Sequence, residues 1–164
     1  MGAGIAGGFL AYGTDTVILG RTQAKAEACF DAITACANSI NEEWSKLGGQ
    51  LLAVSISEWN NWTNTNLVIE TVSERLELKK AIFADLDQRV PPHVPIGSNS
   101  SGFPISDIAG DLTTANRMLN THYFMPAHIV PLVEIVLGEK SNPEIAEQVA
   151  ICSTLVASLL LLHF

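Results

Sequence analysis

Short apolar segments alternate along the chain with longer segments in which apolar residues recur at helical spacing. The short segments predict strands over residues 16–19, 52–56, 67–72, 94–98, 119–124 and 132–136. The helical spacing predicts helices over residues 2–10, 23–47, 74–89 and 105–109, and again from residue 142 onward. Strands that alternate with helices are typical of parallel sheets with helical crossovers. The pattern therefore predicts an α/β protein with a mostly parallel sheet.

Two of the predicted helices have recognisable ends. The amphipathic helix over residues 23–47 ends at Gly48 and Gly49, because glycine after the last periodic residue stops a helix. The helix over residues 74–89 ends before two prolines. Its predicted core face consists of Leu76, Ala81, Ile82, Phe83 and Leu86. Glu70 interrupts the apolar strand before this helix, so we expect it near the exposed end of that strand.

Composition and charge narrow the class of protein. With 164 residues, 48% of them hydrophobic and 16% charged, the chain predicts one folded domain with a proper core. The net charge is −8 and Lys and Arg are not clustered, which excludes a nucleic-acid partner. The apolar tail over residues 151–164 is expected to be a helix. It is shorter than the roughly 20 residues of a membrane span, so no membrane partner is expected.

The cysteines indicate packing and not metal binding. The chain has three, an odd number that fits no metal-ligand spacing, so no metal site is predicted. Cys29 and Cys36 share a helix face as small apolar residues. Reduced thiols indicate an intracellular protein, with the cytoplasm as the default compartment, and the N-terminus lacks the basic region of a signal peptide.

The segment from His122 to Glu134 reads HYFMPAHIVPLVE, two short apolar strands with a break at Pro126. This spacing can bring an imidazole and a carboxylate side by side on adjacent strands. A carboxylate that orients an imidazole makes a base able to remove a proton from an alcohol near neutral pH. The alternative for His122 alone is a core histidine with its hydrogen bonds satisfied.

The beginning of the chain resembles part of a dinucleotide-binding fingerprint. Such a fold opens with a strand, a glycine-rich turn and a helix whose N-terminus faces the pyrophosphate. Here Gly2 corresponds to the third glycine, and no strand precedes it. At the end of the second strand, Gly20 stands where an acid would hold the ribose hydroxyls, and Arg21 follows. This favours NADP as an alternative cofactor; a helix N-cap at Thr22 with a solvated Arg21 is the other interpretation.

Three segments together carry a family resemblance: VIETVSERLELKKAIFADLD, SNSSGFPISDIA and HYFMPAHIVPLVEIVLGE. In this combination and order they resemble the NAD-binding domain of 3-hydroxyacyl-CoA dehydrogenases, over residues 1–150. The resemblance implies a Rossmann-like, doubly wound, mostly parallel sheet that lacks its first strand and the family's helical C-terminal domain. The tail over residues 151–164 is atypical for the family. Full-length relatives are expected to be homodimers.

The resemblance also implies roles for individual residues. His122 is the catalytic base, Glu134 orients it, and Ser101 hydrogen-bonds the substrate oxygen. Asn99 lies in the same loop, near the nicotinamide. Glu74 and Lys79 line the cofactor side, where Gly2, Gly20 and Arg21 also belong. The alternatives to these functional roles are a simple turn for the serine-rich loop and a solvated helix face for Lys79.

The implied reaction is hydride transfer from the 3-hydroxyl carbon of an acyl-CoA to NAD. One alternative is an NADP-dependent dehydrogenase of a small 3-hydroxy acid without CoA, which Arg21, Met125 and Pro131 favour; Met125 stands where the family often has a substrate-contacting asparagine. A second alternative is an inactive, truncated remnant. A sheet without its central strand would leave buried backbone groups unpaired, so we expect the chain alone to be poorly stable or to aggregate, and not to bind dinucleotide tightly.

Overall fold

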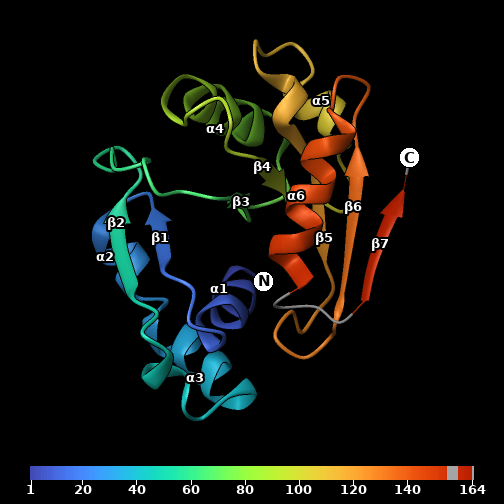
Figure 1. Cartoon of the computed structure of the whole chain (residues 1–164). Coiled ribbons are helices and arrows are strands. Elements are labelled where there is room, and N and C mark those ends of the chain that lie inside the picture. The colour runs from blue at the N-terminus through green and yellow to red at the C-terminus, as the bar shows by residue number, and fades with distance from the viewer. Residues whose placement is uncertain (155–158, 164) are drawn as a thin grey trace. The chain divides into compact units, whose positions relative to one another are not determined.

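The computed structural model describes residues 1–154 and 159–163, which fall into two compact units (Figure 1). The first unit comprises Met1–Asn60 and Phe124–Pro131. The second comprises Asn61–Tyr123, Leu132–Thr154 and the strand Leu159–His163. Among the described residues every strand pair is parallel except one. The predicted α/β class with mostly parallel strands is therefore confirmed.

The first unit contains a two-stranded parallel sheet and three α-helices. Its elements are α1 (Gly2–Ala11), β1 (Thr16–Gly20), α2 (Gln23–Glu27), α3 (Phe30–Ile40), the 3-10 helix η1 (Trp44–Leu47) and β2 (Leu51–Ser55). Buried apolar side chains of α1 and α3 form its core: Ala6, Leu10, Ala11, Ile33 and Ala37. Gly7 permits this packing, because a Cβ there would lie 2.5 Å from Cys36 Cβ and 2.8 Å from the Ile33 carbonyl oxygen.

The single helix expected over residues 23–47 is wrong, since the segment forms α2, α3 and η1. Asn41 explains the second break. Its backbone is extended, with φ −149° and ψ 107°, and its side chain donates to Ala11 O at 3.1 Å and accepts from Glu43 N at 3.0 Å. Asparagine side chains that bond nearby backbone in this way compete with helix continuation. Gly48, at φ 87°, then ends η1 in the left-handed region, as the glycine pair predicts.

The second unit contains a five-stranded sheet in the order β3-β4-β5-β6-β7. Its elements are β3 (Val68–Glu70), α4 (Leu76–Arg89), β4 (Ile96–Ser98), α5 (Ile105–Ala109), η2 (Ala115–Arg117), β5 (Met118–Tyr123), β6 (Leu132–Leu137), α6 (Pro143–Thr154) and β7 (Leu159–His163). Helix α4 packs against α5, and α6 packs against β6 and β7 (Figure 1). The one antiparallel pair, β5–β6, carries the His122 and Glu134 positions.

The end of the chain differs from the helical tail expected over residues 151–164. Helix α6 ends at Thr154, and Leu159–His163 form a strand parallel to β6, with Leu159 opposite Leu132. The rest of the tail lies outside the described residues. A short continuous apolar run cannot be assigned to helix or strand by periodicity alone; here the open edge of β6 offers backbone partners. No helix in the described part of the chain is long and apolar enough to cross a membrane.

The described strands lie in two sheets, β1-β2 and β3-β4-β5-β6-β7. A dinucleotide-binding sheet has its first strand in the middle. Within residues 1–154 and 159–163, no strand pairs with both β1 and a strand of the larger sheet. The β1–β2 pair therefore forms a separate sheet.

Candidate active site

His122 and Glu134 lie directly opposite each other on the antiparallel strands β5 and β6. Directly opposed residues on such a pair point to the same face of the sheet. His122 Nδ1 and Glu134 Oε2 are 2.9 Å apart, and the two side chains are 24% and 40% exposed. The expected contact of imidazole and carboxylate is present. A carboxylate oxygen accepts, so Nδ1 carries the hydrogen of this contact and the lone pair of the neutral ring lies on Nε2.

The neighbour of His122 on β5, Tyr123, serves a different purpose. Its side chain is buried, and its hydroxyl lies 3.3 Å from Ser153 Oγ on α6. Burial raises the pKa of Tyr123 to about 12; the hydrogen bond with Ser153 opposes this shift and nearby Cys152 adds to it. A phenol that stays protonated to such a pH is no base near neutrality.

The serine loop, residues 98–104, leads from β4 to α5 and carries Asn99 and Ser101. Asn99 Oδ1 accepts a hydrogen bond from the backbone N–H of Tyr123 at 2.9 Å. Its own backbone N–H donates to Glu70 O at 2.9 Å. The loop is thereby joined to the strand of His122, one residue beyond the histidine. Ser101 is solvent-exposed within this loop.

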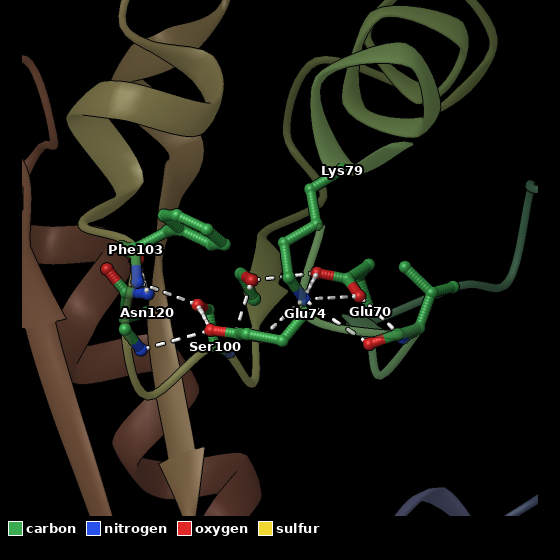
Figure 2. A network of polar contacts seen from close by, with 9 residues as sticks. Glu70, Glu74, Lys79, Ser100, Phe103 and Asn120 are labelled. Atoms are coloured by element: carbon green, nitrogen blue, oxygen red, sulfur yellow. Dashed lines mark hydrogen bonds and ion pairs between the residues drawn. The ribbon is translucent and has the colours of Figure 1, made fainter. Parts of the chain in front are cut away.

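Glu74 holds the same loop from the other side (Figure 2). Its Oε1 accepts hydrogen bonds from Ser100 Oγ and, at 3.0 Å, from the backbone N–H of Gly102. Burial raises the pKa of Glu74, but the hydrogen bonds from Ser100 and Gly102 and the charge of Lys79 outweigh it, so the pKa lies below its ordinary value. The carboxylate is thus bonded to the residues on both sides of Ser101.

Lys79 and Glu70 form a buried ion pair behind Glu74 (Figure 2). Lys79 Nζ lies 3.0 Å from both carboxylate oxygens of Glu70 and 3.3 Å from Glu74 Oε2. Glu70 Oε2 also accepts from Ser98 Oγ at 2.7 Å. The side chains of Lys79 and Glu70 are 1% and 2% exposed. The alternative of a solvated helix face for Lys79 and the expected position of Glu70 near an exposed strand end are therefore both wrong. Each charge is tolerated in the interior because the other neutralises it.

Asn120 is the residue that sequence reasoning missed. Its side chain is buried on β5, two residues before His122. Its Oδ1 accepts from Ile105 N at 2.7 Å, and its Nδ2 donates to Phe103 O at 3.1 Å. The available signal was an amide side chain two residues before His122, at the strand position that shares a face with it.

The nucleotide-end residues belong to the first unit. Gly2 opens α1, where the first backbone N–H groups have no acceptor within the helix and the N-cap residue makes no side-chain hydrogen bond. Such a helix end fits a pyrophosphate. Packing alone also explains a glycine at position 20, because a Cβ there would lie 2.7 Å from Ala26 N on α2. Thr22 caps α2 by accepting from Lys25 N at 3.3 Å, and Arg21 is exposed.

Comparison with known proteins identifies relatives of the whole chain. The family model "3-hydroxyacyl-CoA dehydrogenase, NAD binding domain" matches residues 1–156. A peroxisomal fatty acid beta-oxidation multifunctional protein of Oryza sativa subsp. japonica is 31% identical over an alignment of 155 residues, which covers 88% of this chain and 20% of the rice protein.

Solved structures agree with this match. The 3-hydroxybutyryl-CoA dehydrogenase of Escherichia coli K12 superposes with a TM-score of 0.86 and 29% identity, over 99% of this chain and 35% of that one. M. tuberculosis FadB2 superposes with a TM-score of 0.87 and 26% identity, over 99% of this chain and 60% of that one. The chain thus spans a fifth to three fifths of the relatives compared.

The NAD cofactor and the Rossmann-like fold follow from the family match and these neighbours. Since the matching model covers residues 1–156, nearly the whole sequence, this chain belongs to the family of NAD-binding domains of 3-hydroxyacyl-CoA dehydrogenases.

Proposed function

We propose that the protein containing this chain oxidises the 3-hydroxyl group of an acyl-CoA with NAD as the hydride acceptor. The observation that carries the proposal is the 2.9 Å contact between His122 Nδ1 and Glu134 Oε2 on opposed strands. Oxidation of a secondary alcohol requires a base for the hydroxyl proton, and a carboxylate-backed imidazole supplies one. The chain's membership of this family supports the same reaction.

In this proposal His122 removes the hydroxyl proton through Nε2. Glu134 accepts the Nδ1–H hydrogen bond throughout, so it orients the ring and stabilises the imidazolium that forms when Nε2 takes the proton. Both side chains are partly exposed, at 24% and 40%, as a group that meets a substrate must be. In the reverse direction the same imidazolium returns the proton to the substrate oxygen.

Ser101 is assigned to the substrate oxygen and Asn99 to the nicotinamide side. Ser101 is exposed, while Ser100 and Gly102 on either side of it are bonded to Glu74. A hydroxyl on a loop held at both neighbours can donate to an oxygen without a large loss of conformational entropy. The Asn99 hydrogen bond to Tyr123 N supports its place beside the histidine strand.

NAD, when bound, supplies the hydride acceptor. Among the chain's own residues, we assign the N-terminus of α1 at Gly2 to the pyrophosphate, since helix N-termini attract phosphate. Gly20 and Arg21 are assigned to the adenosine ribose at the end of β1. Glu74 and Lys79 are assigned to the cofactor side of the serine loop, where Glu74 is the more accessible of the two, 43% exposed against 1%.

The proposal is tested with His122→Gln in the whole protein. Removal of a general base lowers kcat by about 10² to 10⁴, while NAD binding is retained because the change is not at the phosphate-binding helix. The matched control is His93→Gln, which makes the same change at an exposed position after two prolines. Turnover that survives His122→Gln shows that His122 is not the base.

A second candidate is an NADP-dependent dehydrogenase of a small 3-hydroxy acid. The observation that favours it is the exposed Arg21 beside Gly20, a glycine in place of the acid that would repel a ribose phosphate. Arg21→Glu distinguishes the candidates: it weakens NADP use and spares NAD use if the guanidinium meets a phosphate. Turnover should be compared on 3-hydroxyacyl-CoA and on the free 3-hydroxy acid. Absence of turnover with every pair of substrate and cofactor would favour the non-catalytic remnant.

A further inference from the structure

Helix α5 begins without a cap from its own sequence. Its N-cap residue is Pro104, which makes no side-chain cap hydrogen bond. The first helical N–H, that of Ile105, instead donates to Asn120 Oδ1 on β5 at 2.7 Å. Asn120 therefore caps α5 from a neighbouring strand, a task that a residue just before the helix ordinarily performs.

The same amide holds the end of the serine loop. Asn120 Nδ2 donates to Phe103 O at 3.1 Å, so its two side-chain hydrogen bonds lie on either side of Pro104 (Figure 2). The pairing of the strands supplies a second attachment, because Asn120 lies opposite Ser98 in the parallel β4–β5 pair. The loop is therefore attached to β5 near its start and again at its end.

Asn120 and His122 are two residues apart on β5. Side chains at i and i+2 of a strand point to the same face. The strand that presents the imidazole thus also presents, on that face, the amide that holds the loop of Ser101. A rigid strand can fix the distance between the base and the serine only if the loop is tied to it.

We infer that Asn120 is a positioning residue for the proposed dehydrogenation, which holds the serine loop at the distance from β5 that Ser101 and His122 require. The inference rests on the proposed function. Asparagine suits this position because it carries a donor and an acceptor on separate atoms. Aspartate keeps the shape and the acceptor but loses the donor, and leucine keeps the approximate volume and loses both.

Burial makes the hydrogen bonds of Asn120 hard to replace. The residue is 5% exposed, so water cannot readily substitute for a lost partner. Loss of the amide leaves Ile105 N–H and Phe103 C=O to find other partners, which requires the loop to move. A shift of about 1 Å in a group that must meet the substrate can lower turnover by roughly 10².

The adjacent Thr121 offers a matched control. It is fully buried on the same strand, on the opposite face, and its Oγ1 has no hydrogen-bond partner in the part of the chain that the structure describes. Thr121→Val therefore changes a buried polar side chain of β5 without loosening the loop.

The experiment compares Asn120→Leu, Asn120→Asp, Thr121→Val and His122→Gln in the whole protein, with 3-hydroxybutyryl-CoA and NAD as substrates. We expect kcat to fall about 10-fold to 100-fold in Asn120→Leu, less in Asn120→Asp, and little in Thr121→Val. The NAD dissociation constant should stay close to wild type in all of them. A change in overall stability alone would not produce this graded loss of kcat with cofactor binding kept.

The possible outcomes distinguish a failure of the proposed function from a failure of the role of Asn120. If His122→Gln is inactive and both Asn120 variants turn over like Thr121→Val, the role of Asn120 is overturned and the proposed function stands. If His122→Gln keeps full turnover, the proposed function fails, and the role of Asn120 fails with it. If Asn120→Leu does not fold, Asn120→Asp decides: a kcat equal to wild type overturns the inference, and a reduced kcat with NAD affinity kept supports it.

Discussion

Two contacts between a basic group and a carboxylate in the second unit have nearly the same length and opposite surroundings. His122 Nδ1 lies 2.9 Å from Glu134 Oε2, with the side chains 24% and 40% exposed. Lys79 Nζ lies 3.0 Å from Glu70 Oε1, with the side chains 1% and 2% exposed. Distance alone does not separate the two contacts. Exposure does, because a group that exchanges protons with a substrate must be reachable and a buried one is not.

The buried pair and the partly exposed pair differ in what they contribute to the stability of the fold. A buried ion pair gains little net stability over an apolar pair, but loss of one partner leaves an uncompensated charge in the interior. The Lys79–Glu70 pair therefore fixes geometry: Glu70 also holds Ser98, and Lys79 reaches Glu74, which holds the serine loop. A partly exposed pair contributes little to stability, which agrees with the chemical role that we propose for His122–Glu134.

The largest effect on stability is expected from Lys79→Met. It keeps the length of the apolar stem and leaves Glu70 buried without its cation, so the free energy of unfolding should fall by about 3–5 kcal/mol. Urea denaturation of the whole protein, followed by circular dichroism, measures this. The control is Lys80→Met on the exposed side of the same helix. Equal losses in the two variants would mean that the buried pair is not important for stability.

Glu134→Gln should have a large effect on turnover and a small effect on stability. We expect kcat of the whole protein to fall about 100-fold, because the amide no longer orients and stabilises the imidazolium. The free energy of unfolding should change by no more than about 1 kcal/mol, since the pair is partly exposed. Steady-state kinetics and urea denaturation of the same variant test both halves. A large loss of stability would show that the contact is structural.

A smaller, pH-dependent effect on stability is expected from substitution of Glu74. Its pKa in the folded protein lies below the ordinary value of 4.5 for a glutamate. It therefore stabilises the fold above pH 4.5, and this contribution is lost as the pH falls below 4.5 through the folded pKa. Glu74→Gln should flatten the acid side of a curve of stability against pH, whereas Glu77→Gln on the exposed face of α4 should leave it unchanged. Two identical curves would contradict the bonding of Glu74 to the serine loop.

The smallest effect is expected from a third pair, Lys46 with Glu43, whose side chains are 71% and 70% exposed. Lys46→Ala should change the free energy of unfolding by less than about 0.5 kcal/mol, because exposed pairs are screened by water and salt. This variant extends the comparison from a buried to a partly exposed to a fully solvated pair. A loss as large as that of Lys79→Met would show that exposure is the wrong variable.

Local patterns predicted most elements of the second unit. Ile105–Ala109 is a helix with the expected bounds, and the strands around His122 and Glu134 are within one residue of those expected. The helix over residues 23–47 was predicted less well. Its second break depends on the hydrogen bond of Asn41 to Ala11, 30 residues away, which no local periodicity records.

The sequence by itself determined the α/β class, the family and the proximity of His122 to Glu134, because these depend on short-range patterns and on motifs in a fixed order. Only the tertiary structure decided that Glu70 and Lys79 are buried together, that Glu74 is bonded to the loop of Ser101, and that Asn120 caps a helix from another strand. The physical reason is common to all three. A charged or amide side chain can be exposed or buried at the same place in the sequence, and what decides is whether residues distant along the chain bring it a partner.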